Sequence, residues 1–171
     1  MGPSGIALPF MLRSHRVPDR GAAPGYLRAG LCEAGRVTES PLVVVDAANV
    51  VGSVPDGWWR DRAGAATRLR DALVPLVDGL PPGGGTPDWA TGPVRIVLVV
   101  EGAARGVPGV EGVTVLAAPR SGDDAIVDLV ADELSAMPSP PCLVVTADRE
   151  LRDRVRRLGA DVIGPRTVYP R

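Results

Sequence analysis

The chain contains a series of short, mainly aliphatic runs, each followed by acidic, small or turn-forming residues. The runs cover residues 42–45, 94–100, 113–116, 143–145 and 161–163. Unbroken aliphatic strands are typical of a parallel sheet, because helices cover both of its faces and leave no solvent-facing positions. The sequence therefore predicts a parallel sheet of about five strands.

Helical patterns separate these runs. Four leucines between residues 69 and 80 recur on one helical face, in a segment that begins near Trp58 and that Pro75 is expected to kink or shorten. Two further helices are expected over residues 122–137 and 149–158, the second closed by Gly159. Strand and helix thus alternate, which predicts a three-layer α/β/α domain over residues 41–171.

Residues 1–40 have a different texture, with Gly or Pro every few positions and no sustained period. Such a segment cannot bury a core, so we expect a poorly structured tail; a wrongly assigned start codon is an open alternative. The apolar run 6–12 is broken by Pro9 and predicts no secretion signal, and no stretch is long enough to span a membrane. Cys32 and Cys142 form no paired motif, which favours a reducing, cytoplasmic setting.

The basic residues exclude several chemistries. All 19 are arginine, so a P-loop lysine and a Schiff base are impossible. The single histidine, His15, lies in the expected tail, which argues against a histidine zinc site or a Ser-His-Asp triad in the domain. Any catalysis must use carboxylates, hydroxyls, amides and arginines.

Acidic residues gather where the predicted strands end. Asp46, Glu101 and Asp148 follow three of the strands, while Asp123 and Asp124 open the helix expected from residue 122. Ligands of open parallel sheets bind at this carboxyl edge, so the five side chains are expected to converge. Crowded carboxylates favour Mg²⁺ or Mn²⁺, ions that can activate water for attack on a phosphodiester without His or Lys.

Each acid also has a purely structural interpretation. The two acids that open the helix 122–137 could cap it together with Ser121, and Asp148 could cap the following helix. Glu101 is more simply a solvated strand end. Asp46 follows an entirely apolar strand and precedes no obvious helix start, so a functional role is favoured there.

Arginines and tryptophans suggest contacts to RNA. Arg149 and Arg152 share one face of the helix 149–158, and Arg60 follows two tryptophans. Arginines can hold phosphates and aromatic rings can stack bases, although a solvated helical face is the simpler interpretation of the arginines. We expect Trp59 to belong to the core.

Three motifs in order carry a resemblance to a known family: VVVDAANVVGS (43–53), SGDDAIVDLV (121–130) and VVTADRELRDRV (144–155). With them the chain resembles the NYN domains of the PIN-like nuclease superfamily, in an actinobacterial-looking subgroup, over residues 42–165. The resemblance implies a sheet of strand order 3-2-1-4-5 and a metal-dependent endoribonuclease that acts on RNA with Mg²⁺ or Mn²⁺.

The resemblance also implies roles for individual residues. The metal ligands would be Asp46, Asp123, Asp124 and Asp148, with Asp46, Asp124 and Asp148 catalytic. Asn49 would be a polar companion of Asp46, and Thr146 would orient Asp148. The acid that this superfamily usually carries in an early helix has no clear match, and Glu101 or Asp128 would have to substitute.

Two other functions stay open at this point. One is a nucleoside triphosphate pyrophosphohydrolase using the same metal, although the sequence lacks the glutamate-rich motifs of such enzymes. The other is a degenerate module that binds RNA or protein without turnover. The sequence leaves open whether the chain forms homo-oligomers.

Overall fold

The computed structural model describes residues 40–169. Its centre is a five-stranded, entirely parallel sheet of order β3-β2-β1-β4-β5. The strands are β1 (Leu42–Asp46), β2 (Arg95–Val100), β3 (Val113–Ala117), β4 (Cys142–Val145) and β5 (Asp161–Ile163). The predicted sheet and its strand order are confirmed. The tail expected over residues 1–40 lies, except for Ser40, outside the described residues and stays a prediction.

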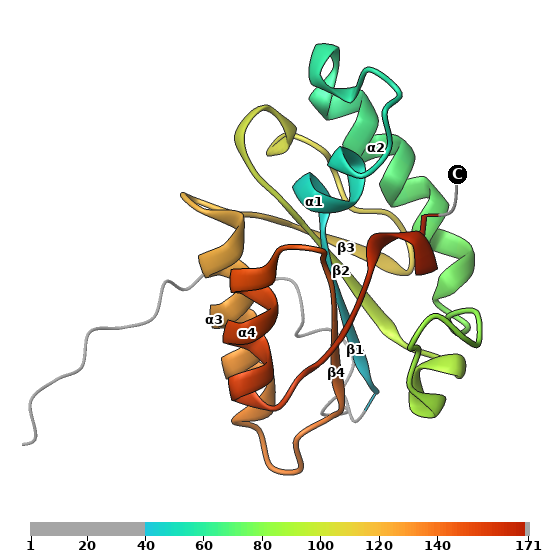
Figure 1. Cartoon of the computed structure of the whole chain (residues 1–171), viewed down its shortest axis with the longest axis vertical. Coiled ribbons are helices and arrows are strands. Elements are labelled where there is room, and N and C mark those ends of the chain that lie inside the picture. Colours follow the sequence, from blue (N-terminus) through green and yellow to red (C-terminus); the bar gives the residue numbers. More distant parts are fainter. Residues whose placement is uncertain (1–39, 170–171) are drawn as a thin grey trace, which may run out of the picture. The chain divides into compact units, whose positions relative to one another are not determined.

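Helices cover both faces of this sheet, as Figure 1 shows, with α3 and α4 on one side and α1 and α2 on the other. Their bounds are α1 (Ala47–Gly52), α2 (Arg62–Leu73), α3 (Gly122–Leu134) and α4 (Arg149–Leu158). The three-layer α/β/α arrangement is therefore confirmed. Among the described residues no helix has the length and apolar character needed to cross a membrane.

Strand β1 lies between two hydrophobic layers, one on each face of the sheet. All five of its residues are buried, and their side chains alternate between the two faces. Val43 and Val45 pack in the layer that contains Leu69 of α2, whereas Val44 packs in the layer that contains Ile126 of α3. Both layers consist mainly of aliphatic side chains, so the position of β1 and of the residue at its end is strongly fixed.

The ends of helices α2 and α3 differ from those predicted from the sequence. Helix α2 begins at Arg62 instead of near Trp58, because the Asp61 side chain accepts a hydrogen bond from the Gly64 amide at 2.8 Å and starts the helix there. It ends at Leu73, and Pro75 falls in the short 3-10 turn η2 (Val74–Leu76), so the expected shortening is confirmed. Helix α3 ends at Leu134, three residues before the expected end at 137.

Candidate functional site

Asp46 is the last residue of the central strand and is only 7% exposed. Its Oδ2 accepts a hydrogen bond from the Thr146 hydroxyl at 3.0 Å, and its Oδ1 accepts one from the Asn49 amide at 3.1 Å. The second bond makes Asp46 the N-cap of α1, so the expectation that no helix starts here is wrong. Helix α1 has only six residues, too few to show a periodic pattern in the sequence.

Thr146 and Asn49 tie the end of β4 to the end of β1. The fully buried Thr146 hydroxyl donates to Asp46 and accepts the Asp148 amide at 3.1 Å. The Asn49 side-chain oxygen accepts the Ala147 amide at 2.7 Å. Both residues expected to support the site therefore lie in it, and their bonds fix the backbone that carries Asp46 and Asp148.

Asp148 caps α4, because its Oδ1 accepts the Leu151 amide at 2.8 Å. The structural interpretation of this residue is thus confirmed. Capping uses one carboxylate oxygen and leaves the charge of Asp148 close enough to raise the pKa of Asp123. One side chain can therefore serve the helix and contribute to an acidic site.

The start of α3 brings the remaining acids to the same edge. Ser121 caps the helix by accepting the Asp124 amide at 3.4 Å. Glu101, which follows β2, accepts the Gly122 amide at 2.7 Å and so lies against the first residue of α3. Asp124 forms an ion pair with Arg154 of α4 at 2.7 Å. This pair could not be anticipated from the sequence, because partners on two separate helices share no local spacing.

The electrostatics show that these carboxylates act on one another. Burial, with smaller contributions from the charges of Asp123 and Glu101, raises the pKa of Asp46 to about 6, against the lowering effect of its two hydrogen bonds. The pKa of Asp123 is raised by burial first and then by Asp148, although Arg154 opposes the shift. The four acids Asp46, Glu101, Asp123 and Asp148 thus form one interacting group, called here the acidic edge.

Carboxylate oxygens suit hard divalent cations. Within residues 40–169 no three acidic, histidine or cysteine side chains are already gathered at the spacing of a metal site. The ion pairs of the described residues do not include Asp46. The pKa values of Asp46 and Asp123 are raised, so a nearby cation would stabilise their ionised forms, and their oxygen donors are of the type that Mg²⁺ and Mn²⁺ prefer.

Asp128 is exposed on α3 and is not among the groups that shift the pKa of Asp46 or Asp123. Asp128 lies one helical turn after Asp124. It is therefore outside the first turn of α3, where Gly122 contacts Glu101. Of the two substitutes considered for the missing acid, the structure brings only Glu101 to the acidic edge.

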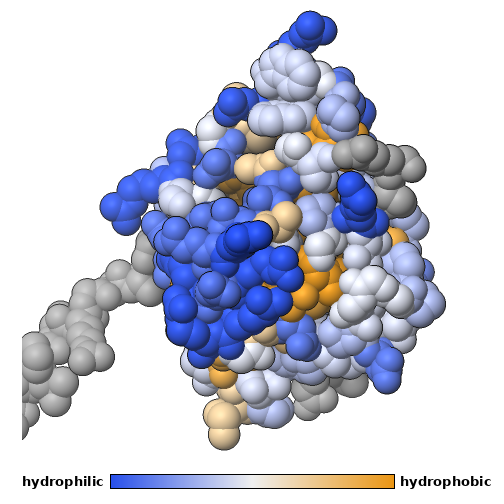
Figure 2. Space-filling view, viewed as in Figure 1, coloured by the Kyte–Doolittle hydropathy of each residue, from blue (hydrophilic) through white to orange (hydrophobic). Residues whose placement is uncertain are grey.

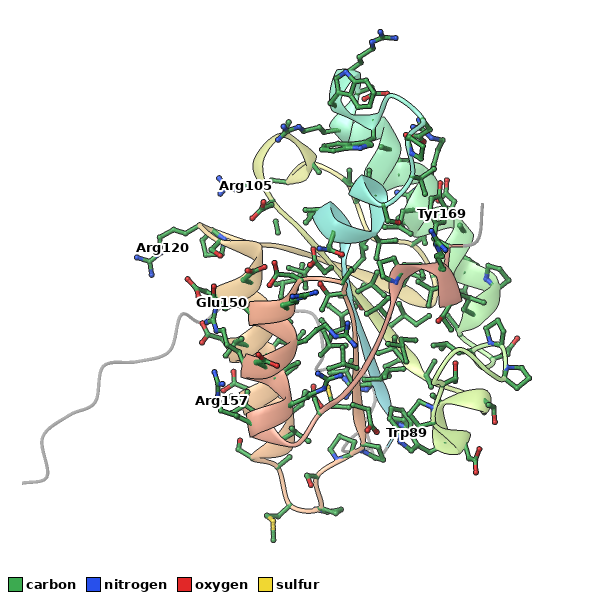
Figure 3. The ribbon with its side chains drawn as sticks, viewed as in Figure 1. Trp89, Arg105, Arg120, Glu150, Arg157 and Tyr169 are labelled. Atoms are coloured by element: carbon green, nitrogen blue, oxygen red, sulfur yellow. The ribbon has the colours of Figure 1, made fainter. Side chains whose placement is uncertain are left out.

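The arginines of α4 form a polar groove beside this edge. Arg149, Arg152, Asp153 and Arg156 line a hollow of about 250 Å³. The Nε of Arg152 is buried and has no hydrogen-bond partner among the described residues. The surface over α4 is strongly hydrophilic in Figure 2, and Figure 3 shows Glu150 and Arg157 near its two ends.

The tryptophan pair lies in the 3-10 turn η1 (Trp58–Arg60). Trp59 is 55% exposed, so its expected place in the core is wrong. Its ring packs edge-on against Trp58, with 6.1 Å between centroids, and the Arg60 guanidinium lies 5.9 Å from its centroid. The half-buried Trp58 contacts the core instead.

Comparison with known proteins places the fold. No protein family model matches the sequence, and no curated protein matches it. Among solved structures, the crystal structure of Rae1 (YacP) from Bacillus subtilis, in a form with one tryptophan replaced by leucine, is similar to this chain with a TM-score of 0.52. The match covers 75% of this chain and 72% of that one at 16% sequence identity, so the likeness is one of fold.

Proposed function

We propose that this chain is a metal-dependent endoribonuclease of the NYN/PIN-like kind, which hydrolyses RNA phosphodiesters at the acidic edge. The observation that carries the proposal is the buried Asp46, whose pKa is raised to about 6 beside other carboxylates at the end of the central strand. Perturbed acids of this kind gather at functional sites. The proposal assigns the activity to the domain over residues 41–171 of a cytoplasmic protein.

The chain's own residues would divide the work. Asp46, Asp123 and Asp148 would hold Mg²⁺ or Mn²⁺, and Asp124 joins this set if its ion pair with Arg154 opens. The bound cation would activate water and neutralise charge on the phosphodiester. Thr146 and Asn49 hold the backbone and the Asp46 carboxylate in place through the hydrogen bonds described above. Such prior positioning is what a ligand set needs.

A binding module without turnover is the alternative that one observation favours. Asp46 and Asp148 each cap a helix, and the Glu101 carboxylate accepts the first amide of α3. If the acids served these structural bonds alone, the same edge would form without a cation. Metal affinity therefore separates the two functions.

The test is calorimetric titration of Mn²⁺ into the full chain and into Asp148→Asn, followed by incubation with single-stranded RNA. Asparagine keeps a capping oxygen for the Leu151 amide but lacks the charge. We expect wild type to bind Mn²⁺ and cleave RNA, and the variant to bind at least about tenfold more weakly. No binding by wild type, or unchanged cleavage by the variant, would contradict the proposal.

Replacing Arg152 by Ala is expected to weaken RNA binding and to make it less dependent on salt. Each phosphate contact to a single strand contributes roughly 0.7 to the slope of log Kd against log salt concentration. The slope should therefore fall by about that amount. Arg157→Ala is the matched control, since Arg157 lies on the same helix outside the groove. If both variants had the same slope of log Kd against log salt concentration, the α4 groove would not contact RNA phosphates.

A further inference from the structure

A second hollow lies on the other side of the acidic edge and has no part in the function proposed so far. It encloses about 70 Å³ between α1, η1, α2 and the turn η4 (Gly102–Ala104). A water molecule needs roughly 15 Å³ by such a measure, so several water-sized groups fit. We call this hollow the η1 pocket.

Small residues keep the η1 pocket open. Four of its lining residues are alanines, Ala47, Ala48, Ala66 and Ala104, and Gly102 adds no side chain. The Trp58 ring forms the one aromatic wall. Larger aliphatic side chains at these positions would fill the pocket. The pocket is therefore a shaped apolar slot with an aromatic side.

Two charged groups stand among these apolar walls. The Arg62 guanidinium lies 5.6 Å from the centroid of the Trp58 ring, and Glu101 lines the pocket from the end of β2. One oxygen of Glu101 accepts the Gly122 amide, and a carboxylate has further acceptor capacity. The slot thus offers a flat aromatic surface, a planar cation and a hydrogen-bond acceptor.

The pocket is continuous with the acidic edge. Ala47, which lines it, directly follows Asp46, and Glu101 belongs to both. A ligand in the pocket would therefore have its neighbouring groups at the carboxylates. Glu101 disfavours a second carboxylate close to it, whereas a neutral planar ring can lie against Trp58 and Arg62 and donate an N–H to Glu101.

We propose that the η1 pocket binds one unpaired nucleobase of the RNA, against Trp58 and Arg62 and with a base amino group donating to Glu101. This inference rests on the proposed function and narrows it. A base must be unpaired and unstacked from its neighbours to lie against Trp58, so the substrate class is single-stranded RNA or a loop. The pocket selects which nucleotide lies beside the scissile phosphate.

The test measures binding without cleavage. Fluorescence anisotropy in EDTA gives the Kd of a labelled RNA hexanucleotide and of the same RNA made abasic at each position in turn. Wild type should lose affinity about tenfold at one position, as expected for one stacked base. Trp58→Leu should weaken the intact RNA by a similar factor and show no further loss at that position, because the two changes remove the same contact.

Two further variants keep the result interpretable. Trp59→Leu is the matched control, since the exposed neighbouring indole does not line the pocket, and its Kd should change less than about twofold. Ala48→Phe fills the pocket from an exposed position of α1 and should imitate Trp58→Leu without removing a core contact. A flat abasic scan in wild type, no binding of the hexanucleotide, or an unaltered scan in both pocket variants would overturn the inference.

Failure of this inference and failure of the proposed function give different results. A position-dependent scan together with no Mn²⁺-dependent cleavage would leave a base-binding pocket on a protein that is not a nuclease. Cleavage together with a flat scan would leave a nuclease that reads no base here.

Discussion

Asp46→Asn is expected to stabilise the protein against unfolding by about 1 to 3 kcal/mol at pH 7.5 and to abolish its activity. In the folded protein the pKa of Asp46 is about 6, against 3.8 ordinarily, mainly because the carboxylate is buried. Each pKa unit corresponds to about 1.4 kcal/mol, so ionised Asp46 costs the folded state about 3 kcal/mol. Asparagine avoids this cost. Its single oxygen can accept the Asn49 amide but not the Thr146 hydroxyl as well, so the net gain is expected to be no more than about 3 kcal/mol.

The sign of the pH dependence follows from the same shift. Because the folded state binds the Asp46 proton more tightly than the unfolded state, wild type gains stability relative to Asp46→Asn as the pH falls through 6. The difference between the two proteins should vanish below about pH 3, where the acid is neutral in both states. Urea denaturation in EDTA at several pH values measures it.

Asp128→Asn is the matched control for this experiment. Asp128 is an exposed aspartate of α3, so its replacement should change stability by less than about 0.5 kcal/mol at every pH. In cleavage assays Asp46→Asn should lose more than the roughly 100-fold that loss of a supporting group costs. A variant that is less stable than wild type at pH 7.5, or a difference that is independent of pH, would show that Asp46 is held as a structural cap.

Thr146→Val is expected to destabilise the protein by about 2 to 4 kcal/mol and to weaken Mn²⁺ binding about 10- to 100-fold. Valine has the shape of threonine but cannot donate to Asp46 or accept the Asp148 amide, so two polar groups lose their partner. The hydroxyl lowers the pKa of Asp46 in wild type, and its loss should raise that pKa further. Denaturation, calorimetry and NMR titration of the carboxyl carbon measure the three effects.

Two variants separate positioning by Thr146 from general destabilisation. Thr146→Ser keeps the hydroxyl and should restore Mn²⁺ affinity and the pKa of Asp46. Val144→Ala removes buried side-chain volume two residues earlier in β4 and should lower stability without moving that pKa. If Thr146→Val changed stability alone, Thr146 would be a packing residue and not a positioning residue.

The sheet could be predicted from the sequence because its strands β1 and β4 are buried on both faces. Runs such as residues 143–145 leave no polar position at which an alternative pattern could compete. The helix ends were less predictable. Helix α2 begins where the Asp61 side chain meets one amide, and such a contact leaves no periodic signal.

The sequence predicted which residues lie in the candidate site better than it predicted the contacts between them. Topology brings Asp46, Glu101 and Asp148 to one edge, as expected of strands that end side by side. The bonds between them depend on side-chain directions. Nothing in the sequence shows that Asp124, and not the adjacent Asp123, forms the ion pair with Arg154. The η1 pocket could not be predicted from the sequence either, because it is a space between four separate segments.

The hydrogen bond from Thr146 to Asp46 joins residues 100 positions apart in the chain. During synthesis Asp46 and Glu101 are made well before Asp148, and β1 acquires its β4 neighbour only when residues 142–145 exist. A chain synthesised only as far as residue 141 therefore contains three of the four residues of the acidic edge, Asp46, Glu101 and Asp123. It lacks Asp148 and the Thr146 hydroxyl that donates to Asp46. The proposed nuclease would thus become competent only after residues 142–148 have been synthesised and β4 has paired with β1.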